Sequence, residues 1–122
     1  MNSFKSEELQ DFIYDYIEIL GNLITFLDDN GFDIKFIGFV IELKDRWEEA
    51  FDIICFKDCS DECLNLSENF TLDNLLEDTR NLYKEVGKRL YERIKRHEII
   101  RNKLKFQREY LSVMNSINKY FD

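Results

Sequence analysis

Apolar side chains recur at steps of three and four along most of this chain, and no proline interrupts them. Such spacing places them on one face of an α-helix, which turns once in about 3.6 residues. One stripe comprises Leu9, Ile13, Tyr16, Leu20, Leu23 and Leu27, and the next Phe36, Val40, Leu43, Trp47, Ala50 and Ile54. The sequence therefore predicts an all-α fold, with helices over roughly residues 4–29 and 34–56.

A third apolar stripe follows Thr71 and continues almost to the last residue. It comprises Leu72, Leu75, Leu82, Val86, Leu90, Ile94, Ile100, Leu104, Leu111, Met114 and Ile117. The pattern predicts one long helix over residues 71–120, preceded by a loop over 57–70. We expect a single helical domain over residues 1–122, built as a three-helix antiparallel bundle with a long C-terminal helix.

The expected third helix is too long for the rest of the bundle. At a rise of about 1.5 Å per residue it would extend about 70 Å, more than either earlier helix can cover. A protruding end, a kink near Gly87 or a homodimer would follow. His97, between two apolar positions of the stripe, is expected to be a core or boundary histidine.

Local signals mark where the helices begin and end. Asp33 and Thr71 are typical N-cap residues, because their side-chain oxygens can accept hydrogen bonds from the first backbone N–H groups. Asp28-Asp29-Asn30-Gly31 should form a turn, since Asn-Gly readily adopts positive φ. The run Phe36–Ile41 is ambiguous, because a short apolar, β-branched and aromatic segment also suits a buried strand.

Charge is divided unevenly along the chain. Residues 1–70 carry 17 acidic and 5 basic side chains, a net charge of −12, whereas residues 71–122 carry 8 acidic and 12 basic ones, a net charge of +4. The overall charge of −8 argues against direct nucleic-acid binding. The basic tract comprises Lys84, Lys88, Arg89, Arg93, Lys95, Arg96, Arg101, Lys103, Lys105 and Arg108.

That basic tract has two interpretations. Its cations could contact nucleic acid or an anionic membrane. The simpler expectation is that they are solvated or pair with acids of the first two helices, which are Asp11, Asp15, Glu18, Glu42, Asp45, Glu48, Glu49 and Asp52. Exposed pairs of this kind contribute only about 0–1 kcal/mol each.

The chain shows no sign of a membrane span or of a secretory signal. No run approaches the roughly 20 apolar residues that a span requires, and the first residues lack the basic-then-apolar plan of a signal peptide. The odd cysteine count, three, fits reduced thiols better than disulfides. We therefore expect a cytoplasmic protein that does not associate with membranes.

No constellation for catalysis or metal binding is evident. Cys55, Cys59 and Cys63 would need a fourth ligand for zinc, and their spacing differs from the usual zinc-binding patterns. The single histidine, His97, has no serine or cysteine beside it in a recognisable motif. We expect no enzymatic activity, no cofactor and no metal.

Several segments together resemble the flagellar export chaperones of the FliT type, with FlgN-like chaperones as near relations. They are the leading helix from Tyr16 through Leu27, the turn Asn30-Gly31-Phe32-Asp33, a helix containing Arg46, and a closing helix with the basic, tyrosine-ended tail Lys103–Tyr120. The resemblance implies a cytoplasmic, non-enzymatic chaperone that holds a helical terminal segment of an export substrate in an apolar groove.

Candidate residues for such a groove lie beside the main stripe of the third helix. They are Tyr83, Tyr91, Ile99, Phe106 and Tyr110. The same residues could instead widen the core or form a homodimer seam. The tail Tyr110–Phe121 could fold back over the groove.

A second functional hypothesis rests on the acidic half. A small phage-encoded inhibitor, of the anti-CRISPR or another anti-defence kind, could use its carboxylates to occupy a nucleic-acid site on a basic host protein. The candidate acidic surface comprises Glu42, Asp45, Glu48, Glu49 and Asp52. Both hypotheses describe a protein that acts by binding another protein.

Overall fold

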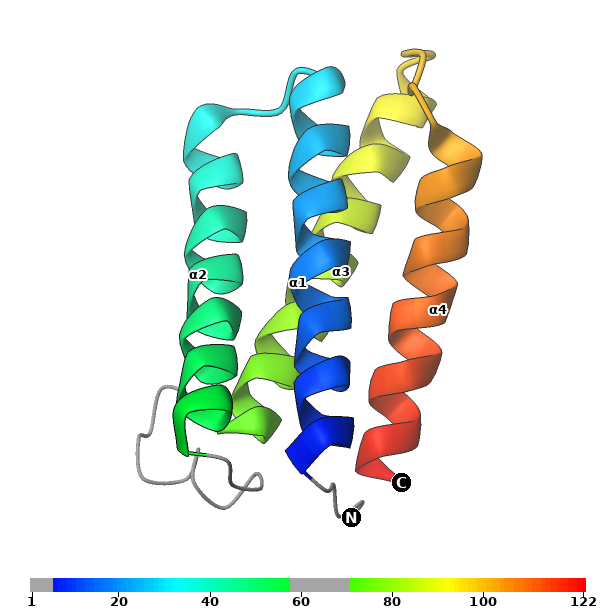
Figure 1. Cartoon of the computed structure of the whole chain (residues 1–122). Helices are drawn as coiled ribbons and strands as arrows, with labels where there is room; N and C mark the ends of the chain where they lie inside the picture. Colours follow the sequence, from blue (N-terminus) through cyan, green and yellow to red (C-terminus); the bar gives the residue numbers. More distant parts are fainter. Residues whose placement is uncertain (1–5, 58–70) are drawn as a thin grey trace.

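The computed structural model describes residues 6–57 and 71–122 and contains four α-helices there (Figure 1). These are α1 (Ser6–Asp29), α2 (Ile34–Lys57), α3 (Leu72–Lys95) and α4 (Lys103–Phe121). The all-α prediction is confirmed, and no strand occurs within the two described ranges. The ambiguous segment 36–41 is part of α2. Residues 58–70 of the expected loop lie outside the described residues.

The helices alternate in direction, so the α1–α2 turn and the α3–α4 turn lie at the same end of the bundle (Figure 1). Their buried side chains form one hydrophobic core. The ring of Tyr16 in α1 stacks on Trp47 in α2, with centroids 4.8 Å apart. The Trp47 indole N–H donates to Thr79 Oγ1 in α3 at 3.0 Å, and the Tyr16 hydroxyl donates to Ser116 Oγ in α4 at 3.0 Å. This chain of contacts joins all four helices.

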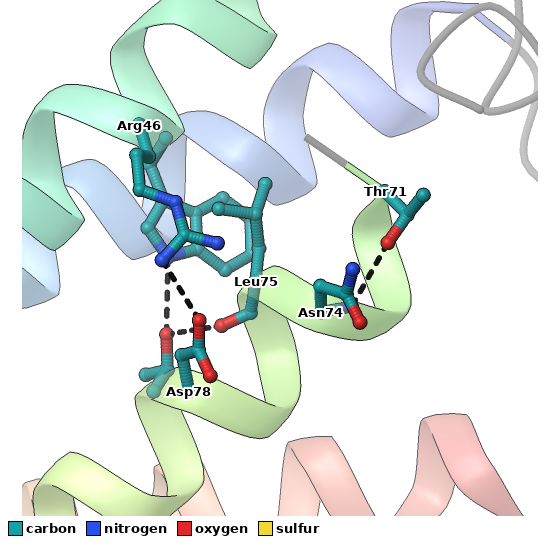
Figure 2. Close-up of polar contacts among 7 residues, drawn as sticks. Arg46, Thr71, Asn74, Leu75 and Asp78 are labelled. Atoms are coloured by element: carbon teal, nitrogen blue, oxygen red, sulfur yellow. Dashed lines mark hydrogen bonds and ion pairs between the residues drawn. The ribbon is translucent and has the colours of Figure 1, made fainter. Parts of the chain in front are cut away.

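The two predicted N-caps are confirmed. Asp33 Oδ1 accepts the backbone N–H of Lys35 at 3.2 Å, and Thr71 Oγ1 accepts that of Asn74 at 3.2 Å (Figure 2). Each bond satisfies one of the N–H groups that the first turn of a helix leaves without a partner.

The prediction of one helix over residues 71–120 is wrong, because the chain reverses between Lys95 and Lys103. The reversal begins at His97, whose φ of 62° is left-handed. The N–H of His97 donates to Ile94 O at 2.9 Å, and that of Glu98 donates to Arg93 O at 3.0 Å. This pair of bonds is the Schellman motif, which ends a helix.

The α1–α2 turn closes in the same way. Gly31 has a φ of 67°, its N–H donates to Asp28 O at 3.1 Å, and that of Phe32 donates to Leu27 O at 3.0 Å. Both reversals at this end of the bundle therefore use one geometry. In the first reversal the left-handed residue is Gly31, a residue type that indicates a turn in the sequence. In the second reversal the left-handed residue is His97. His97 is exposed, so the expectation of a core or boundary histidine is wrong.

The reversal changes which residues of the expected third stripe are buried. Ile94, Leu104 and Leu111 are 42%, 65% and 62% exposed, respectively. α4 instead buries a stripe of its own, made of Phe106, Val113, Ile117 and Tyr120.

The overlong helix that suggested a homodimer is absent from this structure. Because α4 folds back along the bundle, α3 needs no second copy to cover it, and the homodimer stays a prediction without that support. The expected kink near Gly87 is also absent, since α3 runs through Gly87 without a break. None of the helices in the described ranges is both long enough and apolar enough to span a bilayer.

Candidate functional site

An apolar groove of about 700 Å³ lies between α3 and α4. Its lining combines apolar and aromatic side chains with three lysines: Lys84, Gly87, Lys88, Leu90, Tyr91, Ile94, Lys103, Phe106, Gln107, Tyr110 and Leu111. Tyr91 is 60% exposed, and Ile94 and Leu111 are also exposed. The groove is thus a surface feature with several large apolar side chains facing solvent.

Aromatic stacking fixes the floor of the groove. The Phe106 ring lies 4.9 Å from that of Phe26 in α1 and 5.9 Å from that of Tyr83 in α3, and both pairs are nearly parallel. Tyr110 packs beside them, with its ring centroid 6.0 Å from that of Phe106. Because these rings belong to the common core, the floor has little freedom to rearrange when a ligand binds.

Gly87 of α3 lines the groove together with Tyr110 of α4. A Cβ atom at this position would lie 3.5 Å from Tyr110 Cε2, an ordinary van der Waals distance. The absence of a side chain at residue 87 leaves the middle of the groove open.

The structure separates the five residues that the sequence suggested for partner binding. Tyr91, Phe106 and Tyr110 line the groove, although Phe106 is a buried floor residue. Tyr83 is fully buried beneath the floor, so it belongs to the core. Ile99 is 92% exposed in the α3–α4 turn and does not line the groove.

Sequence reasoning missed the rest of the lining. The sequence places Ile94 and Leu111 in the expected buried stripe and the lysines in the general basic tract. The available signal was a second helical stripe, Phe106, Tyr110, Val113, Ile117 and Tyr120, whose spacing of four, three, four and three residues marks the face that α4 packs against the core.

Tyr83 is fully buried behind the groove, and Glu109 of α4 is partly buried. Burial raises the pKa of the Tyr83 hydroxyl, and the nearby Glu109 carboxylate raises it further. This hydroxyl has no hydrogen-bond partner among the described residues. Burial also raises the pKa of Glu109, whereas Lys105 lowers it. Both shifts favour the neutral forms of these groups.

The predicted acidic surface lies on α2. Glu42, Asp45, Glu49 and Asp52 are exposed, whereas Glu48 is half-buried and bonds to Lys44 at 2.5 Å. No ion pair among the described residues joins this surface, or Asp11, Asp15 and Glu18 of α1, to the basic tract. Of the two simple expectations for the basic tract, solvation or pairing with these acids, the pairing is therefore not found in the described part of the chain.

The cations of the basic tract have other neighbours. The guanidinium groups of Arg89 and Arg93 lie over the rings of Phe36 and Phe32, each 4.1 Å from the ring centroid. Arg89 also pairs with Glu85 one turn earlier in α3, at 3.1 Å. An ion pair between α2 and α3 has the reverse polarity, with Arg46 of α2 bonding Asp78 of α3 at 2.8 Å (Figure 2).

No group of metal-binding side chains is present within residues 6–57 and 71–122. Cys55 is exposed near the end of α2, and Cys59 and Cys63 lie outside the described residues.

Comparison with known proteins returned no match among protein-family models, curated proteins or solved structures.

Proposed function

We propose that this protein is a non-enzymatic protein-binding module whose α3–α4 groove holds a helical segment of a partner. The observation that carries this proposal is the cluster of exposed apolar side chains along the groove, above all Tyr91, Ile94 and Leu111. A partner helix that lays its apolar face between two antiparallel helices would remove these side chains from water. Burial of this kind contributes about 25 cal/mol per Å² of apolar surface.

The rigid floor supports the same proposal. Phe106 is held between Phe26 and Tyr83, so the groove exists before a partner arrives. A preformed site avoids part of the ordering cost that binding otherwise imposes.

This function corresponds to the one implied by the resemblance to flagellar export chaperones. In that proposal the protein is cytoplasmic, uses no cofactor, and keeps the helical segment of an export substrate soluble until transfer. The groove involves α4, which contains the tyrosine-ended tail that contributed to the resemblance.

Site-specific photo-crosslinking tests the proposal. A benzoylphenylalanine residue would replace Leu111 in the groove or, as a control, Phe39 on α2, because these side chains are similarly exposed at 62% and 64%. We expect position 111 to crosslink one protein through one helical segment, and position 39 to leave it unlabelled. Equal labelling of that protein from both positions would contradict binding in the groove.

A second candidate function rests on the acidic surface of α2. Glu42, Asp45, Glu49 and Asp52 are exposed, and none forms an ion pair with another described residue. Their spacing along α2 gathers the four carboxylates toward one side of the helix. Such a surface supports an acidic inhibitor that occupies the nucleic-acid site of a basic protein, in the manner of anti-CRISPR proteins.

A further inference from the structure

The charged side chains along the groove are all positive. Lys84 and Lys88 project from α3 and Lys103 from α4, and no acidic residue lines the groove. None of these lysines forms an ion pair with another residue in the described ranges. The groove is thus apolar and carries positive charge, although the net charge of the protein is −8.

The groove has the length of a short helix. Its α3 side runs from Lys84 to Ile94 and its α4 side from Lys103 to Leu111. At about 1.5 Å per residue these segments extend roughly 15 Å and 12 Å, which corresponds to about two to three turns of a docked helix.

From this charge and shape we infer that the partner segment is an amphipathic helix of about two to three turns, with acidic side chains flanking its apolar stripe. This inference rests on the proposed function and adds the chemistry of the partner. The apolar stripe contacts Tyr91, Ile94 and Leu111, while the flanking carboxylates approach the lysines on both sides. Charge complementarity of this kind selects among partners more than it adds affinity.

Two other occupants fit the groove less well. A second copy that used the same groove would bring two sets of lysines together, which is unfavourable. A small acidic amphiphile would stay largely in contact with water, because Tyr91, Ile94 and Leu111 are exposed, whereas small-molecule sites usually enclose most of the ligand.

Two synthetic peptides test the inference. Both would carry a leucine stripe at helical spacing, with glutamates flanking the stripe in one peptide and lysines in the other. Fluorescence anisotropy with the full chain should show the glutamate peptide binding at least tenfold more tightly. The Leu111→Ala variant should weaken its binding, whereas Phe39→Ala should not.

Charge reversal in the groove provides the matched control. Lys84→Glu with Lys88→Glu should reverse the preference between the two peptides. Lys35→Glu with Lys119→Glu makes the same change in net charge on lysines that do not line the groove, so it should leave the preference intact.

Each outcome bears on one of the two proposals. Equal binding of both peptides, weakened by Leu111→Ala, would overturn the acidic partner but leave the protein-binding groove in place. If neither peptide binds, both the acidic partner and the protein-binding groove are overturned. Tighter binding of laurate than of either peptide would assign the groove to a small amphiphile. Dimers of the protein alone, lost in Leu111→Ala, would assign it to a second copy.

Discussion

The side-chain amide of Asn30, in the α1–α2 turn, forms two hydrogen bonds with the backbone of Arg101, in the α3–α4 turn. The N–H of Arg101 donates to Asn30 Oδ1 at 2.8 Å, and Asn30 Nδ2 donates to Arg101 O at 3.2 Å. The guanidinium of Arg93 also donates to the backbone carbonyl of Asn30. One residue of the first turn therefore fixes the position of the second, next to the groove that opens between α3 and α4.

Replacement of Asn30 by alanine should loosen the α3–α4 turn. Both side-chain bonds to Arg101 would be lost, and each is expected to contribute about 0.5–1 kcal/mol because they are partly solvated. Hydrogen exchange should accelerate over residues 96–102 while the helix interiors keep their protection. Asn115→Ala, at an exposed site in α4, is the control. Unchanged exchange over 96–102 in Asn30→Ala would contradict this role.

The first two helices and their caps could be predicted from the sequence, because their apolar stripes are bounded by residues that favour a helix cap or a turn. Asp33 and Gly31 are residues whose side chain or backbone freedom directly produces a cap or a turn. The reversal between α3 and α4 could not be predicted in the same way. His97 carries the left-handed conformation there, and histidine is a much weaker signal than glycine. Ile94, Ile100 and Leu104 also continue the helical spacing across the break.

The candidate site was predictable only in part for the same reason. Tyr91, Phe106 and Tyr110 were recognised from their position beside the main stripe. The groove itself depends on α4 lying antiparallel to α3, and this pairing is a tertiary feature that helical periodicity does not specify. Once α4 is recognised as separate, Leu111 changes from an expected core residue to an exposed groove residue.

Gly87→Ala should stabilise the protein. Glycine within a helix costs about 0.5–1 kcal/mol relative to alanine, and the added Cβ would lie 3.5 Å from Tyr110 Cε2 without a clash. Urea denaturation should show an increase in unfolding free energy of that size. A decrease would mean that the α3–α4 contact is tighter than the structure indicates.

Thr79→Val should destabilise the core by about 1–3 kcal/mol, because it leaves the buried indole N–H of Trp47 without its acceptor. Thr79→Ser is the matched control, since serine keeps the hydroxyl that accepts from Trp47 and donates to Leu75 O at 2.7 Å in the present structure. Chemical denaturation followed by tryptophan fluorescence measures both variants. A larger loss in Thr79→Ser than in Thr79→Val would show that the threonine methyl group, rather than the hydroxyl, matters.

Two buried tyrosines should respond oppositely to loss of their hydroxyls. Tyr16→Phe removes a hydrogen bond to Ser116 and should cost about 1 kcal/mol. Tyr83→Phe removes a buried hydroxyl that has no partner among the described residues, so it should leave stability unchanged or raise it by about 1 kcal/mol. Thermal denaturation compares the variants. A loss in Tyr83→Phe as large as that in Tyr16→Phe would reveal a partner for the Tyr83 hydroxyl.

Alkaline pH should weaken the fold through the same two side chains. Burial raises the pKa of both Tyr16 and Tyr83 above the ordinary value of 10.0. Above about pH 10 the unfolded chain releases these protons while the folded chain retains them, so the free energy of unfolding falls as pH rises. Denaturation between about pH 9 and 11 should show a shallower fall in Tyr83→Phe than in the original protein. Parallel curves would contradict this assignment.

Partner capture at two salt concentrations should separate the two proposed functions. If the groove binds a helix, Tyr91→Ala with Leu111→Ala should weaken capture at least tenfold, because both exposed side chains line the groove and neither belongs to the buried core. Tyr83 and Phe106 are unsuitable for this test, because truncation of a buried aromatic side chain would destabilise the fold. Moderate salt should change capture only slightly, since exposed lysine–carboxylate contacts contribute little to affinity.

The acidic-inhibitor function predicts the opposite pattern. Capture should fall steeply with salt and should be lost when the α2 surface is neutralised by Glu42→Gln, Asp45→Asn, Glu48→Gln, Glu49→Gln and Asp52→Asn. The groove variant would then bind normally. Circular dichroism of each variant controls for folding, because all of these substitutions except Glu48→Gln are at exposed positions. Salt-sensitive capture that survives the loss of Tyr91 and Leu111 would overturn the groove as the binding site and assign function to the acidic surface.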